Sequence, residues 1–211
     1  NGFLLASVTD DYDGQTRATL TPVDIGADAG NFVGIDLSAP VITYTALGNT
    51  TSTGDRALVA TITDVTGVPT SGVLQPRIYY KKNAGSWFSS QGSLASGTGA
   101  NGVWNFTIVA AAMGGLTAGD TVSYYVIAQD TAPTPNIGSN PAGAVATDVN
   151  TVTTPPATSN SYTILAAISG TKYVGSVNSA SCPALDYATI TAAVAALNGA
   201  VLTSPTTFIL C

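Results

Sequence analysis

Any metal chemistry of this chain depends on aspartate, because all twelve acidic residues are Asp and none is Glu. Asp11 and Asp13 stand at alternate positions just before Gly14. Alternate carboxylates in a tight turn can face one ion, so calcium binding at this turn is one interpretation. Thr9 and Leu20 occupy the first and last ligand positions of an EF-hand loop and leave it incomplete, so a plain Asx-type turn is the alternative.

Three further aspartates, Asp64, Asp120 and Asp130, fall at the ends of predicted strands. Aspartate at such positions commonly accepts hydrogen bonds from turn amides. A shared metal ion would require the carboxylates to meet at one end of the fold. Apart from calcium at these aspartates, the sequence predicts no cofactor.

Catalytic machinery is largely excluded by composition. The chain has no His, which rules out Ser-His-Asp and Cys-His arrangements and His-ligated zinc. Glycosidase chemistry would need two Asp side chains, and no pair has a supporting context. The sequence therefore predicts no catalytic residues and a protein that is not an enzyme.

Exposed aromatic side chains offer a different chemistry, stacking on sugar rings. Tyr79 and Trp87 are the candidates, with Lys81 and Lys82 nearby. In a β-sandwich half of such aromatics must point inward, so core packing is the competing interpretation.

Charge and cysteine content limit the partners. The net charge is −6, which makes nucleic-acid binding implausible because counterion release needs clustered Lys and Arg. The longest apolar runs are far shorter than the roughly 20 residues of a transmembrane helix, so no membrane insertion is expected. Cys182 and Cys211 are an even pair in a chain of secreted character, which favours a disulfide; two reduced buried thiols are the alternative.

A series of short strands must position these residues. Alternating apolar and polar positions, with Gly, Pro, Asn or Asp at the boundaries, predict an all-β chain with an immunoglobulin-like (Ig-like) sandwich over residues 37–166. Seven strands are expected: Val41–Ala46, Ala57–Thr63, Gln75–Lys82, Ser86–Ser89, Val103–Val109, Thr121–Gln129 and Ser161–Leu165. Residues 1–36 form a separate strand-like segment that is too short to fold alone.

The Pro- and Thr-rich stretch 131–160 has no clear period. It is interpreted as a long connection before the last strand of the sandwich. The alternative is a linker that ends the sandwich at Gln129.

Residues 167–211 change in character. A strand is predicted at Lys172–Val177 and a helix follows, with Asp186 as its N-cap and an apolar face at helical spacing. Asn198 and Gly199 end the helix, and Thr206–Leu210 reads as a final strand.

The two ends of the chain resemble parts of parallel β-helix domains in large secreted surface proteins of bacteria. The residues from Asp11 to Arg17 and from Val23 to Asp28 are similar to the tail that closes such a β-helix. The stretch Tyr187–Leu197 and Pro205–Phe208 are similar to the helical cap and first strand that open one. The middle of the chain resembles the Ig-like modules, including fibronectin-III-like ones, placed beside these domains.

This resemblance implies an extracellular or cell-surface structural or adhesive protein, a subunit or segment of a bacterial fibre. Other copies of itself, bound head-to-tail, and surface glycans are the expected partners. The self-association residues are apolar and lie near the two ends: Phe3, Leu4, Leu5, Phe208, Ile209 and Leu210. The alternative is an accessory carbohydrate-binding module of a polysaccharide-active β-helix enzyme.

Overall fold

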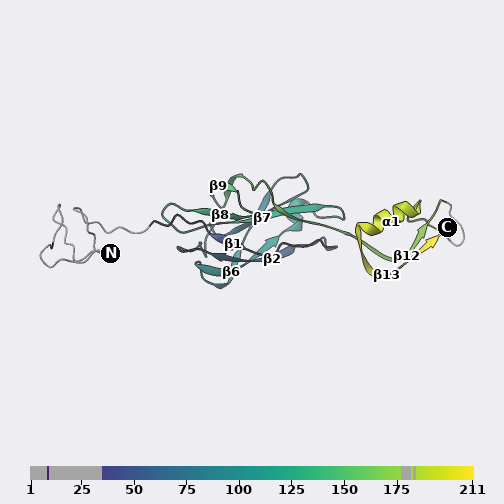
Figure 1. Ribbon diagram of the computed structural model, residues 1–211, viewed down its shortest axis with the longest axis horizontal. Helices are drawn as coiled ribbons and strands as arrows, with labels where there is room; N and C mark the ends of the chain where they lie inside the picture. Colours follow the sequence, from purple (N-terminus) through teal and green to yellow (C-terminus); the bar gives the residue numbers. More distant parts are fainter. Residues whose placement is uncertain (1–8, 10–34, 177–181, 183) are drawn as a thin grey trace. The chain divides into compact units, whose positions relative to one another are not determined.

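The computed structural model describes Thr9, residues 35–176, Cys182 and residues 184–211. The chain divides into two units, Asn1–Asp36 and Leu37–Cys211. The second unit contains a β-sandwich and, after it, a βαβ segment (Figure 1). The all-β sandwich predicted from the alternating pattern is confirmed.

One sheet of the sandwich is antiparallel, with the strand order β1-β2-β6-β5. Its strands are β1 (Val41–Thr43), β2 (Arg56–Thr63), β5 (Ser93–Gly97) and β6 (Asn101–Ile108). Every second residue of β2 and β6 is buried, because adjacent side chains of a strand point to opposite faces. This sheet therefore has one face in the core and one in solvent.

The other sheet has the order β11-β7-β3-β4. Its strands are β3 (Arg77–Lys82), β4 (Phe88–Gln91), β7 (Thr121–Gln129) and β11 (Asn160–Thr163). Two strands share one edge of β7: β11 pairs with its first half and β8 (Ile137–Asn140) with its second half. The two sheets together have the strand order of the immunoglobulin fold: β1-β2-β6-β5 correspond to its strands A, B, E and D, and β11-β7-β3 to its strands G, F and C.

Large side chains fill the space between the sheets. Trp104 on β6 is completely buried, as is Tyr124 on β7. The Tyr124 hydroxyl accepts a hydrogen bond of 2.6 Å from the amide of Leu47, which fixes the segment between β1 and β2. A short 3₁₀ helix, η2 (Ala110–Met113), connects β6 toward β7 and buries its first and last residues against this core.

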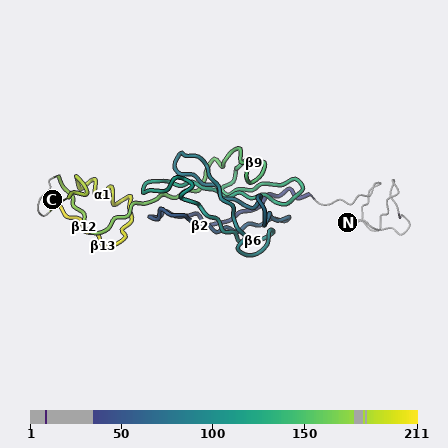
Figure 2. Tube along the Cα trace, turned by 180° about the vertical axis from the view of Figure 1, so that it is seen from behind, coloured from purple at the N-terminus to yellow at the C-terminus, as the bar shows by residue number. Residues whose placement is uncertain are grey.

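The stretch 131–160 covers the outer face of the second sheet. After β8 it forms a hairpin of β9 (Val145–Asp148) and β10 (Thr151–Thr154). Figures 1 and 2 show β9 beside the sandwich from opposite sides. A second apolar cluster lies beneath it, centred on Tyr125, Ile127 and Val149. Both faces of β7 are therefore buried.

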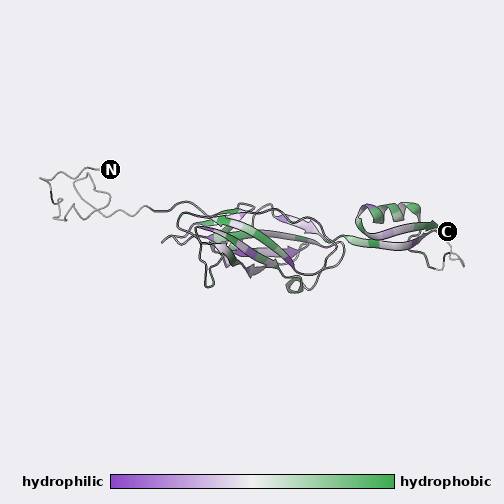
Figure 3. Cartoon of the chain, turned by 90° about the horizontal axis from the view of Figure 1, so that it is seen from below, coloured by the Kyte–Doolittle hydropathy of each residue, from purple (hydrophilic) through white to green (hydrophobic). Residues whose placement is uncertain are grey.

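The βαβ segment consists of β12 (Ala166–Val174), α1 (Ile190–Asn198) and β13 (Ala200–Leu210). The two strands are parallel and form a two-stranded sheet, and each is longer than the sequence predicted. Figure 3 shows hydrophobic residues along α1 and on the strands it faces.

The start of α1 differs from the prediction. Thr189 is the N-cap, and its side chain accepts a hydrogen bond of 3.1 Å from the amide of Ala192. Asp186 was expected to be the N-cap, and that prediction is wrong. Its carboxylate accepts instead from the Tyr173 amide at 2.9 Å and forms an ion pair with Lys172 at 3.3 Å. The helix ends before Gly199, as predicted.

Candidate functional site

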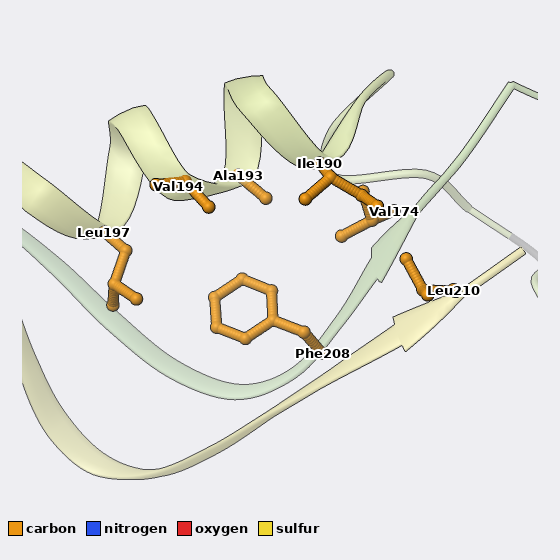
Figure 4. A pocket seen from close by; sticks show the side chains of 7 residues that line it. All are labelled: Val174, Ile190, Ala193, Val194, Leu197, Phe208 and Leu210. Atoms are coloured by element: carbon orange, nitrogen blue, oxygen red, sulfur yellow. The ribbon is translucent and has the colours of Figure 1, made fainter.

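An open apolar groove lies between α1 and the parallel strands. It has a volume of about 240 Å³ and is lined only by apolar residues. Its walls come from all three elements of the βαβ segment: Val174, Ile190, Ala193, Val194, Leu197, Phe208 and Leu210. Figure 4 shows the Phe208 ring below the helix, with these side chains around it.

The helix supplies one wall because its apolar residues recur at helical spacing. Ile190, Val194 and Leu197 lie on one face of α1 by the 3.6-residue period. Ala193, on the same face, is the buried residue of the helix. Ile190 and Val194 keep 59% and 48% of their surface exposed, so the groove is only partly filled by the described chain.

The outer edge of β13 is open in the part of the chain that the structure describes. β13 pairs with β12 alone, whereas the far edge of β12 is partly covered by a parallel bridge between Val174 and Tyr187. Pro205 interrupts β13 near a shift in register, and the five residues from Thr206 to Leu210 pair in step with Gly170–Val174. This half of β13 is the strand that the sequence predicted.

Charge is missing from this region. No residue from Tyr187 to Cys211 is charged. Edge strands of stable monomers commonly carry Lys or other charges that prevent pairing with another chain. Leu202 and Leu210 on β13 are instead 53% and 68% exposed.

A disulfide joins the residue that follows β13 to the segment between β12 and α1. Cys182 and Cys211 are joined, with their Cα atoms 6.0 Å apart, as predicted. The amide of Cys211 also donates to the Val174 carbonyl at 2.8 Å. Cys211, the residue that follows β13, is thus tied both to β12 and to the loop before α1.

The predicted self-association residues fall on both units. Phe208, Ile209 and Leu210 lie on β13, and Phe208 and Leu210 line the groove. Phe3, Leu4 and Leu5 lie outside the described residues, as do the candidate calcium ligands Asp11 and Asp13. Val174 could not be predicted from the sequence as a residue that lines the groove, because its position depends on the parallel pairing of two strands that are distant in the chain.

The predicted sugar-binding residues lie in the second apolar cluster. The Tyr79 ring stacks on Tyr125 with centroids 5.2 Å apart, and its hydroxyl donates to the Val149 carbonyl at 2.9 Å. Trp87 meets the edge of Tyr125 at 5.0 Å, and the Lys81 ammonium lies 4.9 Å from the Trp87 centroid. These contacts use part of the ring surface that a sugar would need.

The three strand-end aspartates separate into two places. Asp120 precedes β7 and accepts hydrogen bonds from the Thr117 amide and from the Asn83 side chain, which lower the pKa of its carboxyl. Asp130 follows β7 and therefore lies at the opposite end of that strand. Asp64 lies beside Asp130, with carboxylate oxygens within 4.8 Å of one another.

No protein-family model matches the chain, and a search of curated proteins finds no match.

Within the described residues, no helix has the length and apolar character that crossing a membrane requires.

Proposed function

We propose that the protein is an extracellular structural or adhesive protein without catalytic activity, a subunit or segment of a bacterial surface fibre that assembles through its terminal strands. The observation that carries this proposal is the open edge of β13 beside an uncharged, partly filled apolar groove.

A two-stranded parallel sheet with exposed faces and edges is expected to be unstable in water. Parallel sheets occur almost only with both faces buried, and two strands alone are marginally stable in water. Another strand on the free edge of Thr206–Leu210 would satisfy the open backbone groups by β-augmentation. An apolar residue of that strand would also cover the groove beside Leu210.

A second copy of this chain supplies a matching segment. Residues 3–8 are uncharged and mostly apolar, and they belong to the other unit of the chain. Pairing of this segment with β13 of the next copy is a heterologous, head-to-tail contact, and such contacts build open fibres when the rotation does not close a ring. The disulfide and the sparse charge support an extracellular location for this assembly.

The test is the assembly state at increasing concentration, measured by light scattering and electron microscopy. The wild-type chain should form fibres, and Leu210→Asp should abolish them because a carboxylate cannot be buried in the groove without a partner. Val59→Asp is the matched control, since Val59 is an exposed apolar residue of β2. That variant should assemble as the wild type does.

Deletion of residues 1–8 tests the partner segment and should also leave monomers with a folded sandwich. Fibres from the truncated chain would show that another segment occupies β13. A wild-type chain that stays monomeric at high concentration contradicts the proposal. Specific binding on a glycan array that is lost on changing Trp87 would instead favour the carbohydrate-binding alternative.

A further inference from the structure

The chain contains three Asn-Gly pairs: Asn1-Gly2, Asn101-Gly102 and Asn198-Gly199. Such a pair is chemically labile, because glycine has no Cβ to obstruct attack of its backbone nitrogen on the asparagine side chain. The attack also requires the backbone to leave regular secondary structure, so the fold decides which pair reacts. The first pair lies outside the described residues, and the other two lie in different environments.

Asn101-Gly102 is held within β6. Asn101 pairs with Thr63 of β2, and Gly102 pairs with Ile62 of β2 and with Gly97 of β5. Gly102 is also buried. The backbone of this pair therefore cannot rotate until the first sheet of the sandwich opens.

Asn198-Gly199 lies instead where α1 ends and β13 begins. Both residues are exposed, and Asn198 is the last residue of the helix. The Gly199 amide donates to the Leu197 carbonyl rather than to the Ala195 carbonyl that a continued helix would use. Among the described residues, none forms a hydrogen bond with the Asn198 side chain. Because helix ends fray, this pair is free to reach the reactive geometry.

We propose that Asn198 is a site of spontaneous deamidation. The Gly199 nitrogen attacks the side-chain carbonyl carbon of Asn198 and forms a C–N bond. The side-chain nitrogen then leaves as ammonia and takes with it the proton of the Gly199 amide. Water opens the resulting succinimide at either carbonyl, which gives aspartate or isoaspartate. Water is the only co-reactant, and one carboxylate replaces one carboxamide.

The modification places a negative charge in a region that has none. No side chain from Tyr187 to Cys211 is charged. The new carboxylate lies at the C-terminal end of α1, where the helix dipole disfavours a negative charge. Isoaspartate also lengthens the backbone between α1 and β13, because its main chain runs through the side-chain carbon. Deamidation should therefore loosen α1, and this chemistry is independent of the assembly proposed above.

Ageing of the full chain at mildly alkaline pH, followed by reduction, tryptic digestion and mass spectrometry, tests the proposal. Cleavage after Lys82 and Lys172 separates the two described pairs into peptides 83–172 and 173–211. Fragment ions should place an Asn-to-Asp mass gain at Asn198 that forms at least about tenfold faster than at Asn101, because attack at Asn101 requires the sheet to open. In urea, where neither pair is held, both should convert at similar rates.

Gly199→Ala is the matched variant, because its methyl group obstructs attack by the backbone nitrogen. A Cβ at Gly199 meets no atom closer than 3.9 Å, so this variant should fold. It should slow conversion at Asn198 at least about tenfold and leave Asn101 unchanged. Hydrogen exchange of the α1 amides should accelerate about two- to fivefold in the aged wild type and stay constant in the aged variant.

Equal rates at Asn101 and Asn198 in the folded protein overturn the proposal. A peptide 173–211 that stays unmodified at Asn198 while the urea-treated sample converts also overturns it. Equal conversion at Asn198 in Gly199→Ala and wild type has the same consequence, because attack by the Gly199 nitrogen would then not set the rate.

Discussion

The sandwich buries its apolar residues, whereas the βαβ segment leaves most of its apolar residues exposed. In the sandwich, β7 has buried residues on both faces, between the central core and the cluster beneath β9 and β10. In the βαβ segment, β13 is longer than β7, yet none of its residues is buried. The first region completes its own core, whereas the second has an apolar face and an open edge. Under the proposed function, the sandwich supplies stability and the βαβ segment supplies the surface for association.

Alkaline solution should affect the sandwich most strongly. Burial raises the pKa of the Tyr124, Tyr125 and Tyr162 hydroxyls. Folded protein therefore holds these protons while the unfolded chain loses them near pH 10, so their contribution is complete below that pH. Above it, stability should fall by up to about 1.4 kcal/mol per pH unit for each tyrosine. Tyrosinate absorbance should appear together with loss of the β-sheet circular dichroism. Ionisation of these tyrosines in a sandwich that stays folded would contradict this expectation.

Trp104→Ala should have the next largest effect. The side chain is completely buried, so its loss leaves a cavity and should cost about 3 to 5 kcal/mol of unfolding free energy. Val59→Ala, at an exposed position of β2, should change stability by less than about 0.5 kcal/mol. Urea unfolding followed by circular dichroism measures both. Equal midpoints would mean that the inward register of β6 is wrong.

Removing the disulfide should affect the βαβ segment and spare the sandwich. The bond joins residues 29 positions apart, and a loop of this length contributes about 3 to 4 kcal/mol in the chain-entropy model. In the double variant Cys182→Ser, Cys211→Ser, β13 should become protease-sensitive while urea unfolding of the sandwich is unchanged. If two thiols titrate in the denatured, unreduced wild type, the disulfide is not formed and this prediction fails.

Thr189→Ala is the smallest of these perturbations. It removes the oxygen that accepts from the Ala192 amide, and loss of such an N-cap costs about 1 kcal/mol. Amide hydrogen exchange in α1 should accelerate about fivefold, with no change in β7. Thr189→Ser keeps a hydroxyl and should exchange its α1 amides at the wild-type rate. If exchange in Thr189→Ser accelerates as much as in Thr189→Ala, the cause is lost packing of the Thr189 methyl group and not the lost N-cap.

Strands with clear alternation could be predicted from the sequence. Thr121–Gln129 was expected with the bounds that β7 has, and the disulfide followed from cysteine count and composition. Strand β5 was missed because four of the five residues of Ser93–Gly97 are small and Leu94 alone gives no apolar period. The hairpin of β9 and β10 was missed for a similar reason, since only Ala146 and Val152 of its two strands pack on the second apolar cluster, too few to give a period.

Features that depend on distant pairing were beyond local patterns. Asp186 has the side chain of a good N-cap, but its carboxylate is used by the Tyr173 amide across the βαβ segment. The sequence placed Asp64 and Asp130 at strand ends without showing that these ends meet. Their proximity follows from the packing of the two sheets, in which β2 and β7 belong to opposite layers, and no spacing along the chain encodes it.

The division of one edge of β7 between β8 and β11 has a consequence for opening of the molecule. Loss of either short strand alone leaves half of that edge paired, and β3 still covers the opposite edge. Local fraying should therefore leave the central amides of β7 protected. Solvent deuterium should enter them only when the whole sandwich unfolds, which makes these amides reporters of the global unfolding equilibrium.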